Sequence, residues 1–302
     1  MTTLSIIILS YNTADLTLKC LKSIQDQYQK QLKSGEFEII VADNASTDGS
    51  VEAIRNFQFS IFNFQSNSNI KTKNFQIIKN EKNYGFSKGN NFGAKEARGK
   101  YLLFLNSDTE IQDRGLLEMI NYLDENENVG VLGAKLLNQD GSSQRSAGKF
   151  YNILNVFLML FGGEKIASIR FSPKIIKEVD WVSGAALMIK KGIFYKLNGF
   201  DEKIFMYMED MELCFRVKRS GFKTVFYPNI TILHKELGSS NRKFAIINIY
   251  KNLLYFYDKH KNFLEYTLIK VLLYLKAILA IVIGIITHNS YLTLTYKKAI
   301  GF

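Results

Sequence analysis

The sequence predicts an α/β fold in which helices flank a mostly parallel sheet, followed by a helical C-terminal region of a different character. Two observations carry this prediction. Short apolar runs alternate with helical patterns through the first half of the chain, as in strand–helix–strand units. Near the C-terminus, basic residues flank one long apolar stretch. We therefore expect an α/β domain at residues 1–240 and a basic, apolar helical region at residues 241–302.

The composition is that of a globular protein with an anionic partner. The 302 residues are 47% hydrophobic and 22% charged, which excludes wholesale disorder. We expect the two cysteines, Cys20 and Cys214, to be core thiols in a reducing compartment. The N-terminus lacks the basic start and cleavage site of a secretory signal, so we expect a cytoplasmic protein. The formal net charge of +11 favours nucleic acid, anionic lipid or a phosphorylated substrate as partner.

Strand and helix signals alternate through the first half. We expect strands at residues 4–9, 37–42, 75–79 and 101–105, and helices at 15–29, 51–57 and in the stretch that ends at residue 98. The stretch 59–74 is rich in Asn, Ser and Gln, which predicts a surface excursion. The strand at 101–105 is almost wholly apolar, which is typical of the centre of a parallel sheet.

The second half is less regular. We expect strands at residues 129–136, 179–189 and 224–233, and helices at 190–197 and 210–218. The Gly/Ser-rich segment 137–149 predicts a mobile loop, and the apolar patch at 152–170 does not define its own structure. Pro228 interrupts its strand, which predicts a position near the edge of the sheet.

Polar residues follow three of the predicted strands: Ser10-Tyr11-Asn12, Asp43 and Asn106-Ser107-Asp108. In a parallel sheet the ligand crevice lies beyond the carboxyl ends of the strands, so these residues would converge on one crevice. A turn or a helix cap also explains each of them singly. The Asp108 carboxylate is well placed to hold Mg²⁺ or Mn²⁺, cations that bind one or two carboxylates together with substrate phosphates.

Two adjacent acids, Glu209 and Asp210, begin the predicted helix at 210–218. Acids at a helix N-terminus interact well with its positive end, which is the structural interpretation. However, the apolar residues just before them indicate a partly dry pocket, where a carboxylate can act as general base on an acceptor hydroxyl. Glu212 and Arg216 are four residues apart, and we expect them to pair on the helix surface.

Two further residues carry open alternatives. His234 ends the last strand of the domain and could complete a metal site or be structural. Trp181 is the only tryptophan, and either sugar stacking or core packing would account for it.

The C-terminal region combines charge and apolarity. Residues 241–302 hold nine Lys or Arg and two acids, beside the unbroken apolar run 277–286. A bilayer span needs about 20 apolar residues, so the wider stretch 263–286 is marginally adequate. An interfacial or re-entrant helix, a true span, and a soluble helix packed on the domain or a partner all fit this pattern.

In order along the chain, these segments resemble family 2 glycosyltransferases of the GT-A fold, a Rossmann-like α/β architecture. The resemblance is greatest to the bacterial branch that includes rhamnosyltransferases of surface polysaccharide assembly, and it covers about residues 4–240. The motifs that carry it are Ile-Leu-Ser-Tyr-Asn (8–12), Asp-Asn-Ala-Ser-Thr-Asp-Gly-Ser (43–50), Asn-Tyr-Gly-Phe-Ser-Lys-Gly-Asn-Asn (83–91), Asn-Ser-Asp (106–108), Gly-Phe-Asp-Glu (199–202), Glu-Asp (209–210) and His234.

The resemblance implies roles for individual residues. Asp210 would be the catalytic base, and Asp108 and His234 would bind the metal. The nucleotide-sugar pocket would contain Tyr11, Asn12, Asp43, Asn83, Asn90, Asn106, Gly184 and Glu209. The metal motif of the family commonly has an acid at both ends, whereas this chain has Asn106 at the first position. One fewer negative charge would then lie near the cation.

The implied activity is inverting transfer of a sugar from UDP-hexose or dTDP-rhamnose to a glycan or lipid-linked acceptor, with Mg²⁺ or Mn²⁺ as cofactor. The enzyme would lie peripherally at the inner face of the cell membrane, with a single span also open, and its C-terminal helices could join copies of the chain. A catalytically silent sugar-nucleotide-binding subunit is the first alternative. Nucleic-acid binding is the second, and it is disfavoured because the excess charge lies beside an apolar segment and no aromatic-basic stacking pattern occurs.

Overall fold

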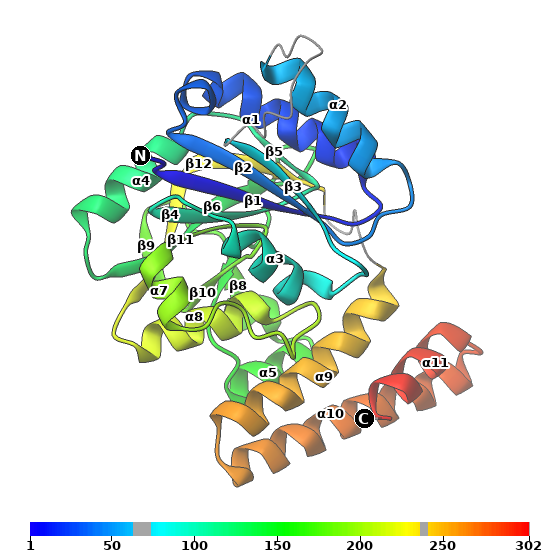
Figure 1. Cartoon of the computed structure of the whole chain (residues 1–302). Helices are drawn as coiled ribbons and strands as arrows, with labels where there is room; N and C mark the ends of the chain where they lie inside the picture. Colours follow the sequence, from blue (N-terminus) through cyan, green and yellow to red (C-terminus); the bar gives the residue numbers. More distant parts are fainter. Residues whose placement is uncertain (63–73, 236–240, 302) are drawn as a thin grey trace.

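The computed structural model describes residues 1–62, 74–235 and 241–301, and its centre is a mixed sheet of nine strands (Figure 1). The strand order is β3-β2-β1-β4-β11-β6-β12-β5, and β9 also pairs with β12. The strands are β1 (Leu4–Ser10), β2 (Phe37–Asp43), β3 (Phe75–Lys79), β4 (Tyr101–Asn106), β5 (Thr109–Ile111), β6 (Val129–Leu137), β9 (Lys177–Val179), β11 (Ala186–Lys190) and β12 (Lys223–His234).

The first four strands in this order are parallel, which confirms the sequence prediction for this half of the sheet. β1 runs parallel to β2 and β4, and β2 runs parallel to β3. Ser10 pairs in register with Asp43, and Leu9 pairs with Asn106, so three strands end at one edge. β6 and β12 are also parallel, whereas β11, β5 and β9 run antiparallel to their neighbours.

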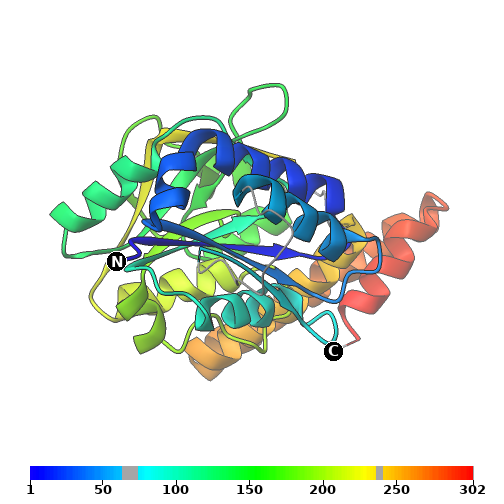
Figure 2. The same cartoon turned by 45° about the horizontal axis from the view of Figure 1, so that its top comes forward.

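Helices cover both faces of the sheet, and each face has its own apolar core (Figures 1 and 2). One core contains residues of α1 (Ala14–Ser34), α2 (Ser50–Phe62) and α4 (Leu116–Glu125). The other contains residues of α3 (Gly85–Lys95), α5 (Ile153–Leu160), α7 (Lys191–Lys196), α8 (Glu209–Arg219), α9 (Arg242–His260), α10 (Phe263–Ile286) and α11 (Ser290–Ala299). Cys20 and Cys214 are buried and free, as expected.

The second half departs from the sequence prediction at residues 179–189, and it gives a structure to residues 152–170, for which none was predicted. The single strand expected at 179–189 is divided among β9, β10 (Trp181–Val182) and β11, with a turn at 183–185 between the last two. The stretch 152–170 forms α5 and the short α6 (Glu164–Ala167), and it reaches β8 (Arg170–Phe171). β8 joins β7 (Ala147–Gly148) and β10 in a second, three-stranded sheet.

Pro228 was expected near the edge of the sheet, and its strand is the last but one in the strand order. β12 lies between β6 and the short strands β5 and β9. The register of β12 against β6 shifts between Tyr227 and Thr231, so Pro228 lies in a bulge. A bulge tolerates proline because the unpaired residue needs no N–H for the ladder. Of the surface excursion expected at 59–74, residues 59–62 extend α2 and 63–73 lie outside the described residues.

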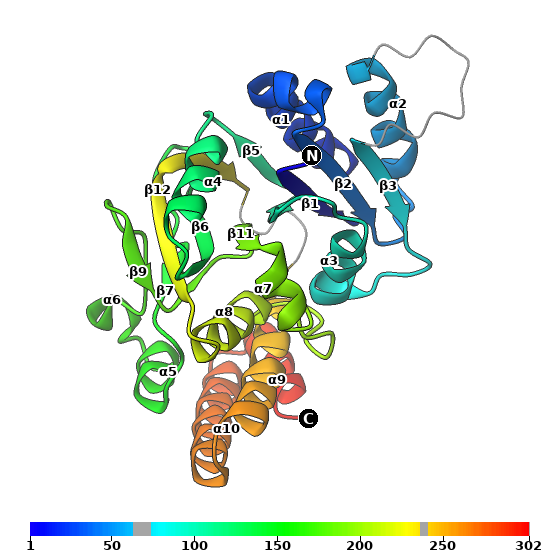
Figure 3. The same cartoon turned by 60° about the vertical axis from the view of Figure 1, so that its left-hand side comes forward.

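The last three helices form an arm below the sheet (Figure 3). α9 shares the core of the α/β domain through Tyr250, Leu253 and Phe256. In α10, a narrow stripe of residues is buried: Ile269, Leu273, Ala277, Ala280 and Gly284. Large apolar side chains elsewhere on α10 are exposed, and this helix alone among the described residues is long and apolar enough to cross a membrane. The domain boundary at residue 240 remains a prediction.

Candidate active site

A cavity of about 620 Å³ opens where β4 and β12 end, beside the N-terminus of α8. Six of the residues to which the resemblance gives a site role line this cavity: Asn106, Asp108, Gly184, Glu209, Asp210 and His234. They come from segments up to 128 residues apart, as the contact between Asn106 and His234 shows. The fold therefore assembles the expected metal-binding and catalytic groups around one space.

One part of the cavity lining consists of a carboxylate, an imidazole and an amide. His234 Nε2 lies 3.4 Å from Asp108 Oδ1 and 3.4 Å from Asn106 Nδ2. The pairing of His234 with Thr109 across β12 and β5 fixes this arrangement, as does the hydrogen bond from the Lys235 N–H to the Asp108 carbonyl at 3.0 Å. The Asp108 side chain is 4% exposed, so water screens its charge weakly.

Gln144 determines that Nδ1 of His234 is protonated. The Gln144 amide nitrogen donates to the His234 carbonyl at 2.8 Å and to Asn138 Oδ1 at 2.7 Å. Because both of these partners are oxygens, the other amide atom, Oε1, must be the one 2.8 Å from His234 Nδ1. Nδ1 then carries a proton, and Nε2 is the nitrogen that faces Asp108. Neutral imidazole in this tautomer is a metal ligand.

These groups fit a hard divalent cation that binds together with substrate. Within residues 1–62, 74–235 and 241–301, no group of three or more His, Cys, Asp or Glu side chains could hold a metal ion by itself. One carboxylate and one imidazole leave coordination positions for phosphate oxygens, which is how Mg²⁺ commonly binds in phosphate-transfer sites. Asn106 adds an amide in place of a second acid, so the site is less negative than a pair of aspartates.

The adjacent acids at the start of α8 also line the cavity. Asp210 accepts hydrogen bonds from the Gly184 N–H at 2.9 Å and the Met211 N–H at 2.7 Å. Glu209 is 6% exposed, and its Oε2 has no hydrogen-bond partner among the described residues. Burial raises the pKa of both carboxyl groups, and the charge of Asp210 raises the pKa of Glu209 further. We therefore expect Asp210 to ionise first and Glu209 to stay protonated beside it.

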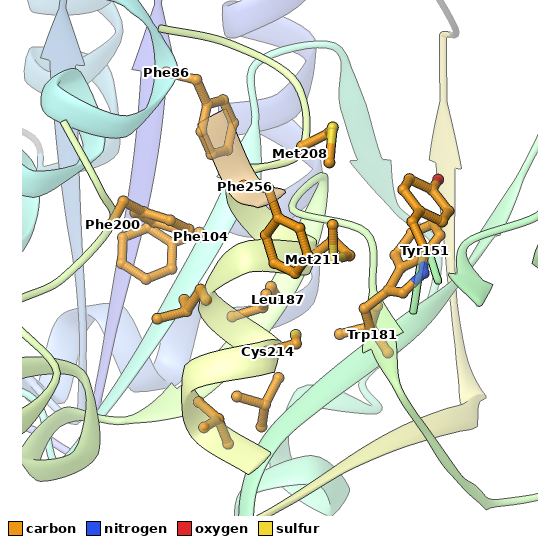
Figure 4. Close-up of a cluster of buried hydrophobic side chains, with 14 of the residues drawn as sticks. Phe86, Phe104, Tyr151, Trp181, Leu187, Phe200, Met208, Met211, Cys214 and Phe256 are labelled. Atoms are coloured by element: carbon orange, nitrogen blue, oxygen red, sulfur yellow. The ribbon is translucent and has the colours of Figure 1, made fainter. Parts of the chain in front are cut away.

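The loop that leads into these acids has an unusual backbone. Tyr207 and Met208 have φ values of 72° and 73°, the left-handed region that non-glycine residues seldom occupy. Asn252 of α9 holds this loop by donating from Nδ2 to the Met206 carbonyl at 2.8 Å and the Tyr207 carbonyl at 2.9 Å. Figure 4 shows Met208 in the apolar cluster that surrounds α8. α9 thus orients the segment that presents Asp210.

Gly85 holds the same loop from the other side. The Phe86 N–H donates to the Phe205 carbonyl at 2.6 Å. Gly85 has a φ of +79°, and a Cβ added there would overlap the Phe205 carbonyl oxygen and the Phe205 ring. Only glycine fits this close approach between α3 and the loop.

Five residues that the sequence placed in the nucleotide pocket do not line this cavity: Tyr11, Asn12, Asp43, Asn83 and Asn90. The side chain of Asn12 accepts from the Thr47 N–H at 2.8 Å, and that of Asn83 accepts from the Gly85 N–H at 2.9 Å.

Asn90 and Asp43 are both buried. Asn90 donates to the Phe86 carbonyl within α3 at 3.0 Å. Asp43 lies at the end of β2, and its Oδ2 has no hydrogen-bond partner in the described part of the chain. The nucleotide roles of these five residues remain predictions.

The ion pair of Glu212 with Arg216 and the position of Trp181 differ in detail from what the sequence predicted. Glu212 and Arg216 do pair, at 2.7 Å, but Glu212 is fully buried, so this is not a surface ion pair. Trp181 packs in the core, and its indole N–H donates to the Lys149 carbonyl at 3.0 Å. It also lines the cavity, so core packing and ligand contact are both open to it.

Sequence reasoning missed four residues of the site: Gln144, Arg145, Arg170 and Asn252. The first two lie in the segment 137–149, whose Gly/Ser-rich composition gives no periodic signal. Arg170 ends a stretch that the pattern left undefined. Asn252 is one polar residue within a helix. The charge of the two arginines is the one signal that could have drawn attention to them.

The architecture defines the class of protein, and solved structures share it. The chain is similar to a mannosyltransferase from Pyrobaculum calidifontis solved with GDP-Man and Mn²⁺, with a TM-score of 0.58 and 14% identity over 98% of this chain and 84% of that one. It is similar also to S. aureus TarS 1-349, with a TM-score of 0.56 and 17% identity over 90% of this chain and 69% of that one. The fold is that of GT-A glycosyltransferases.

The family follows from the sequence match. The model of glycosyl transferase family 2 matches residues 5–190, and the chain belongs to this family. It is 27% identical over 160 residues to the rhamnosyltransferase WbbL of Escherichia coli, covering 50% of this chain and 61% of that protein. For most of the curated relatives that it matches, the chain spans less than two thirds of their length.

Proposed function

We propose that the protein is a metal-dependent inverting glycosyltransferase that moves a sugar from a nucleoside diphosphate donor to a hydroxyl of a glycan or lipid-linked acceptor. The observation that carries this proposal is that Asp108, His234 and Asp210 line one cavity. UDP-hexose and dTDP-rhamnose both remain candidate donors. The family membership and the rhamnosyltransferase relative support a place in surface polysaccharide synthesis.

The proposed chemistry divides between two sets of residues that line the cavity. Asp108 and His234 would hold a divalent cation, which would supply Lewis-acid stabilisation of a departing diphosphate. Asp210 removes the proton of the acceptor hydroxyl as that oxygen attacks the anomeric carbon. The N–H groups of Gly184 and Met211 hold the Asp210 carboxylate in place. Attack opposite the leaving group inverts the configuration, through a transition state of oxocarbenium character.

Glu209 and the nucleotide residues have proposed supporting roles. A protonated Glu209 donates a hydrogen bond from Oε2, its unpartnered oxygen, to the sugar or the phosphate. Tyr11, Asn12 and Asp43 bind base and ribose together with Asn83 and Asn90, and Gly184 and Asn106 border the sugar and ribose.

The C-terminal region, residues 241–302, is proposed to bind the anionic inner face of the cell membrane. Exposed apolar side chains on α10 include Leu268, Leu275 and Ile286, and basic residues lie before and after the apolar run. Basic side chains beside an apolar helical face suit an anionic lipid surface. The same face offers a site for contacts between copies of the chain.

A panel of nucleotide sugars tests the proposed function. We expect nucleoside diphosphate release with one donor when Mg²⁺ or Mn²⁺ is present, and transfer when lipid-linked acceptors are added. A chelator should stop both reactions. If every donor binds without hydrolysis or transfer, the chain is instead a sugar-nucleotide-binding subunit.

Gln144→Leu tests the metal site without relying on activity. Leucine offers no acceptor to His234 Nδ1–H, so the imidazole is no longer held in one orientation and one tautomer. We expect Mn²⁺ affinity in the presence of UDP to fall about 10- to 100-fold. Gln144→Glu separates the two contributions of this side chain, because it keeps an oxygen acceptor for Nδ1 but loses the hydrogen bonds that the amide nitrogen donates to the His234 carbonyl and to Asn138. Titration calorimetry measures both variants, and equal affinities in all three proteins would contradict the assignment of His234 as a ligand.

A further inference from the structure

The Gly-Phe-Asp-Glu motif at residues 199–202 has no part in the chemistry described so far. It lies immediately before the catalytic loop, residues 203–208, which leads into α8 and Asp210. The side chain of Asn91 in α3 donates to the Phe200 carbonyl and accepts from the Phe200 N–H, each at 2.9 Å. The motif is thus anchored to α3, and its position determines where the catalytic loop begins.

The acid of this motif, Asp201, contacts α9. Its Oδ2 accepts hydrogen bonds from Tyr255 Oη at 2.7 Å and from Lys259 Nζ at 2.6 Å. α9 lies against α8 (Figure 3), where the rings of Phe256 and Phe215 are 5.1 Å apart between centroids. The Asp201 side chain is 12% exposed, so water screens these contacts weakly.

Lys259 also contacts the other end of the catalytic loop. Its Nζ lies 2.8 Å from Oε1 of Glu212, a fully buried acid in the first turn of α8. One ammonium group therefore joins an acid before the loop to an acid after it, and the loop is closed at its base. Asn252 of the same helix holds the middle of the loop through two backbone carbonyls.

The three groups at the base of the loop are charged near neutral pH. Burial lowers the pKa of Lys259, but hydrogen bonds to Asp201 and Glu212 bring it above its ordinary value. Burial raises the pKa of Asp201, but hydrogen bonds from Lys259 and Tyr255 bring it below its ordinary value. Without the ammonium group, the two carboxylates would repel each other across its place, and the base of the loop would open.

We propose that Lys259 is a positioning residue for sugar transfer, which fixes Asp210 in place by clamping the two ends of the catalytic loop. Lys259 does not line the cavity, so it acts through Asp201 and Glu212. Residues 241–302, which include α9, therefore serve catalysis as well as location. This inference rests on the proposed function, and it assigns a role in turnover to a helix that supplies no group to the reaction.

Lys259→Met removes the ammonium group and keeps an unbranched side chain. We expect kcat to fall about 10- to 100-fold, because a misplaced base reacts slowly, while KM for the donor stays within about twofold. Lys259→Arg restores a cation between the two acids and should recover most of the lost rate. A normal kcat in the methionine variant, or an arginine variant that is equally slow, would overturn the proposal.

The matched control is Lys190→Met. Lys190 Nζ also donates to two oxygens, the carbonyls of Asn126 and Glu127, at 3.1 and 3.0 Å. Lys190 pairs in register with Tyr101 at the start of β4, whereas the cavity opens where that strand ends. The control should therefore lose stability without a change in kcat. If kcat falls equally in two variants of equal stability, the effect belongs to folding and the proposal is overturned.

Hydrogen exchange gives a readout that does not depend on turnover. In Lys259→Met the amides of residues 203–208 should exchange about tenfold faster than in the wild type, because the base of the loop opens. The amides of β1 and β4 should keep their protection, which separates opening of the loop from global unfolding. Unchanged exchange in the loop would overturn the clamp.

The two proposals can fail separately. Faster loop exchange in Lys259→Met, with no turnover of any nucleotide sugar by the wild type, would contradict the proposed function alone. Turnover by the wild type with an equal kcat in Lys259→Met would contradict this inference alone.

Discussion

The two faces of α8 carry acids with opposite surroundings. Glu209 and Asp210 face the cavity, have no ion-pair partner among the described residues, and have raised pKa values. Glu212, two residues after Asp210, faces α9 and contacts three basic side chains: Arg216, Lys259 and His260. Burial alone would raise the pKa of Glu212, but hydrogen bonds from His260 and Arg216 lower it to about 2.

The difference shows how one short helix serves chemistry and stability together. A buried acid with cationic partners is a permanent charge, and its loss leaves those partners uncompensated. A buried acid without them has a pKa closer to neutrality and can exchange protons. Position on the helix separates Asp210 from Glu212, because residues two apart point to different sides.

The largest effect is expected at the cavity face. Asp210→Asn removes the proposed base while it keeps the shape of the side chain, so transfer should fall about 10²- to 10⁴-fold. Donor affinity should stay within about twofold of that of the wild type. Steady-state rates and calorimetry with the nucleotide sugar measure the two quantities. Turnover at the normal rate would remove Asp210 from the role of base.

On the opposite face, Glu212→Gln should act on stability. Removing one partner of a buried ion network destabilises a protein by about 3 to 5 kcal/mol. The control is Glu178→Gln, whose ion pair with Lys223 is solvent-exposed and should contribute less than about 1 kcal/mol. Urea unfolding measures both variants. Similar losses in the two would contradict the contrast between the faces.

The same residue gives a pH prediction. The pKa of Glu212 falls from 4.5 to about 2 on folding, so its contribution to stability is present above pH 4.5 and is lost as the pH falls toward 2. The unfolding free energy of the wild type should therefore decrease more than that of Glu212→Gln across this range. Parallel curves for the two proteins would show that Glu212 is not held ionised.

A smaller effect is expected where α9 meets the catalytic loop. Asn252→Leu removes the donors that hold the Met206 and Tyr207 carbonyls, and we expect kcat to fall about tenfold with little change in donor affinity. Asn248→Leu is the control, because Asn248 bonds to Phe244 of the same helix and to no other side chain or backbone group among the described residues. An Asn252 variant that loses stability but not kcat would limit this residue to folding.

The smallest effect is expected for Glu209→Gln. If Glu209 is protonated in the working enzyme, glutamine replaces it without a change of charge, and the acid limb of the pH–rate profile should not move. An ionised Glu209 would instead repel Asp210, and its removal would shift that limb to lower pH. The presence or absence of this shift in the acid limb thus reports whether Glu209 is ionised.

The sequence predicted the residues at strand ends well and the contacts between distant segments poorly. Ser10 and Asp43 end adjacent parallel strands, so their convergence follows from the apolar runs that precede them. Gln144 contacts His234 across 90 residues from a segment without periodicity, and no local pattern encodes that contact. The pair of Glu212 and Arg216 was placed on the surface because helical spacing does not reveal that α9 covers it.

At Gly85, the substitutions that α3 tolerates are limited by contact with the catalytic loop. Its backbone conformation and its contact with Phe205 admit no side chain, so even alanine would displace the chain that leads to Asp210. A saturation library at this codon should therefore return glycine alone among active clones. A single methyl group on α3, a helix that contributes no catalytic acid, would thus cause a loss of turnover.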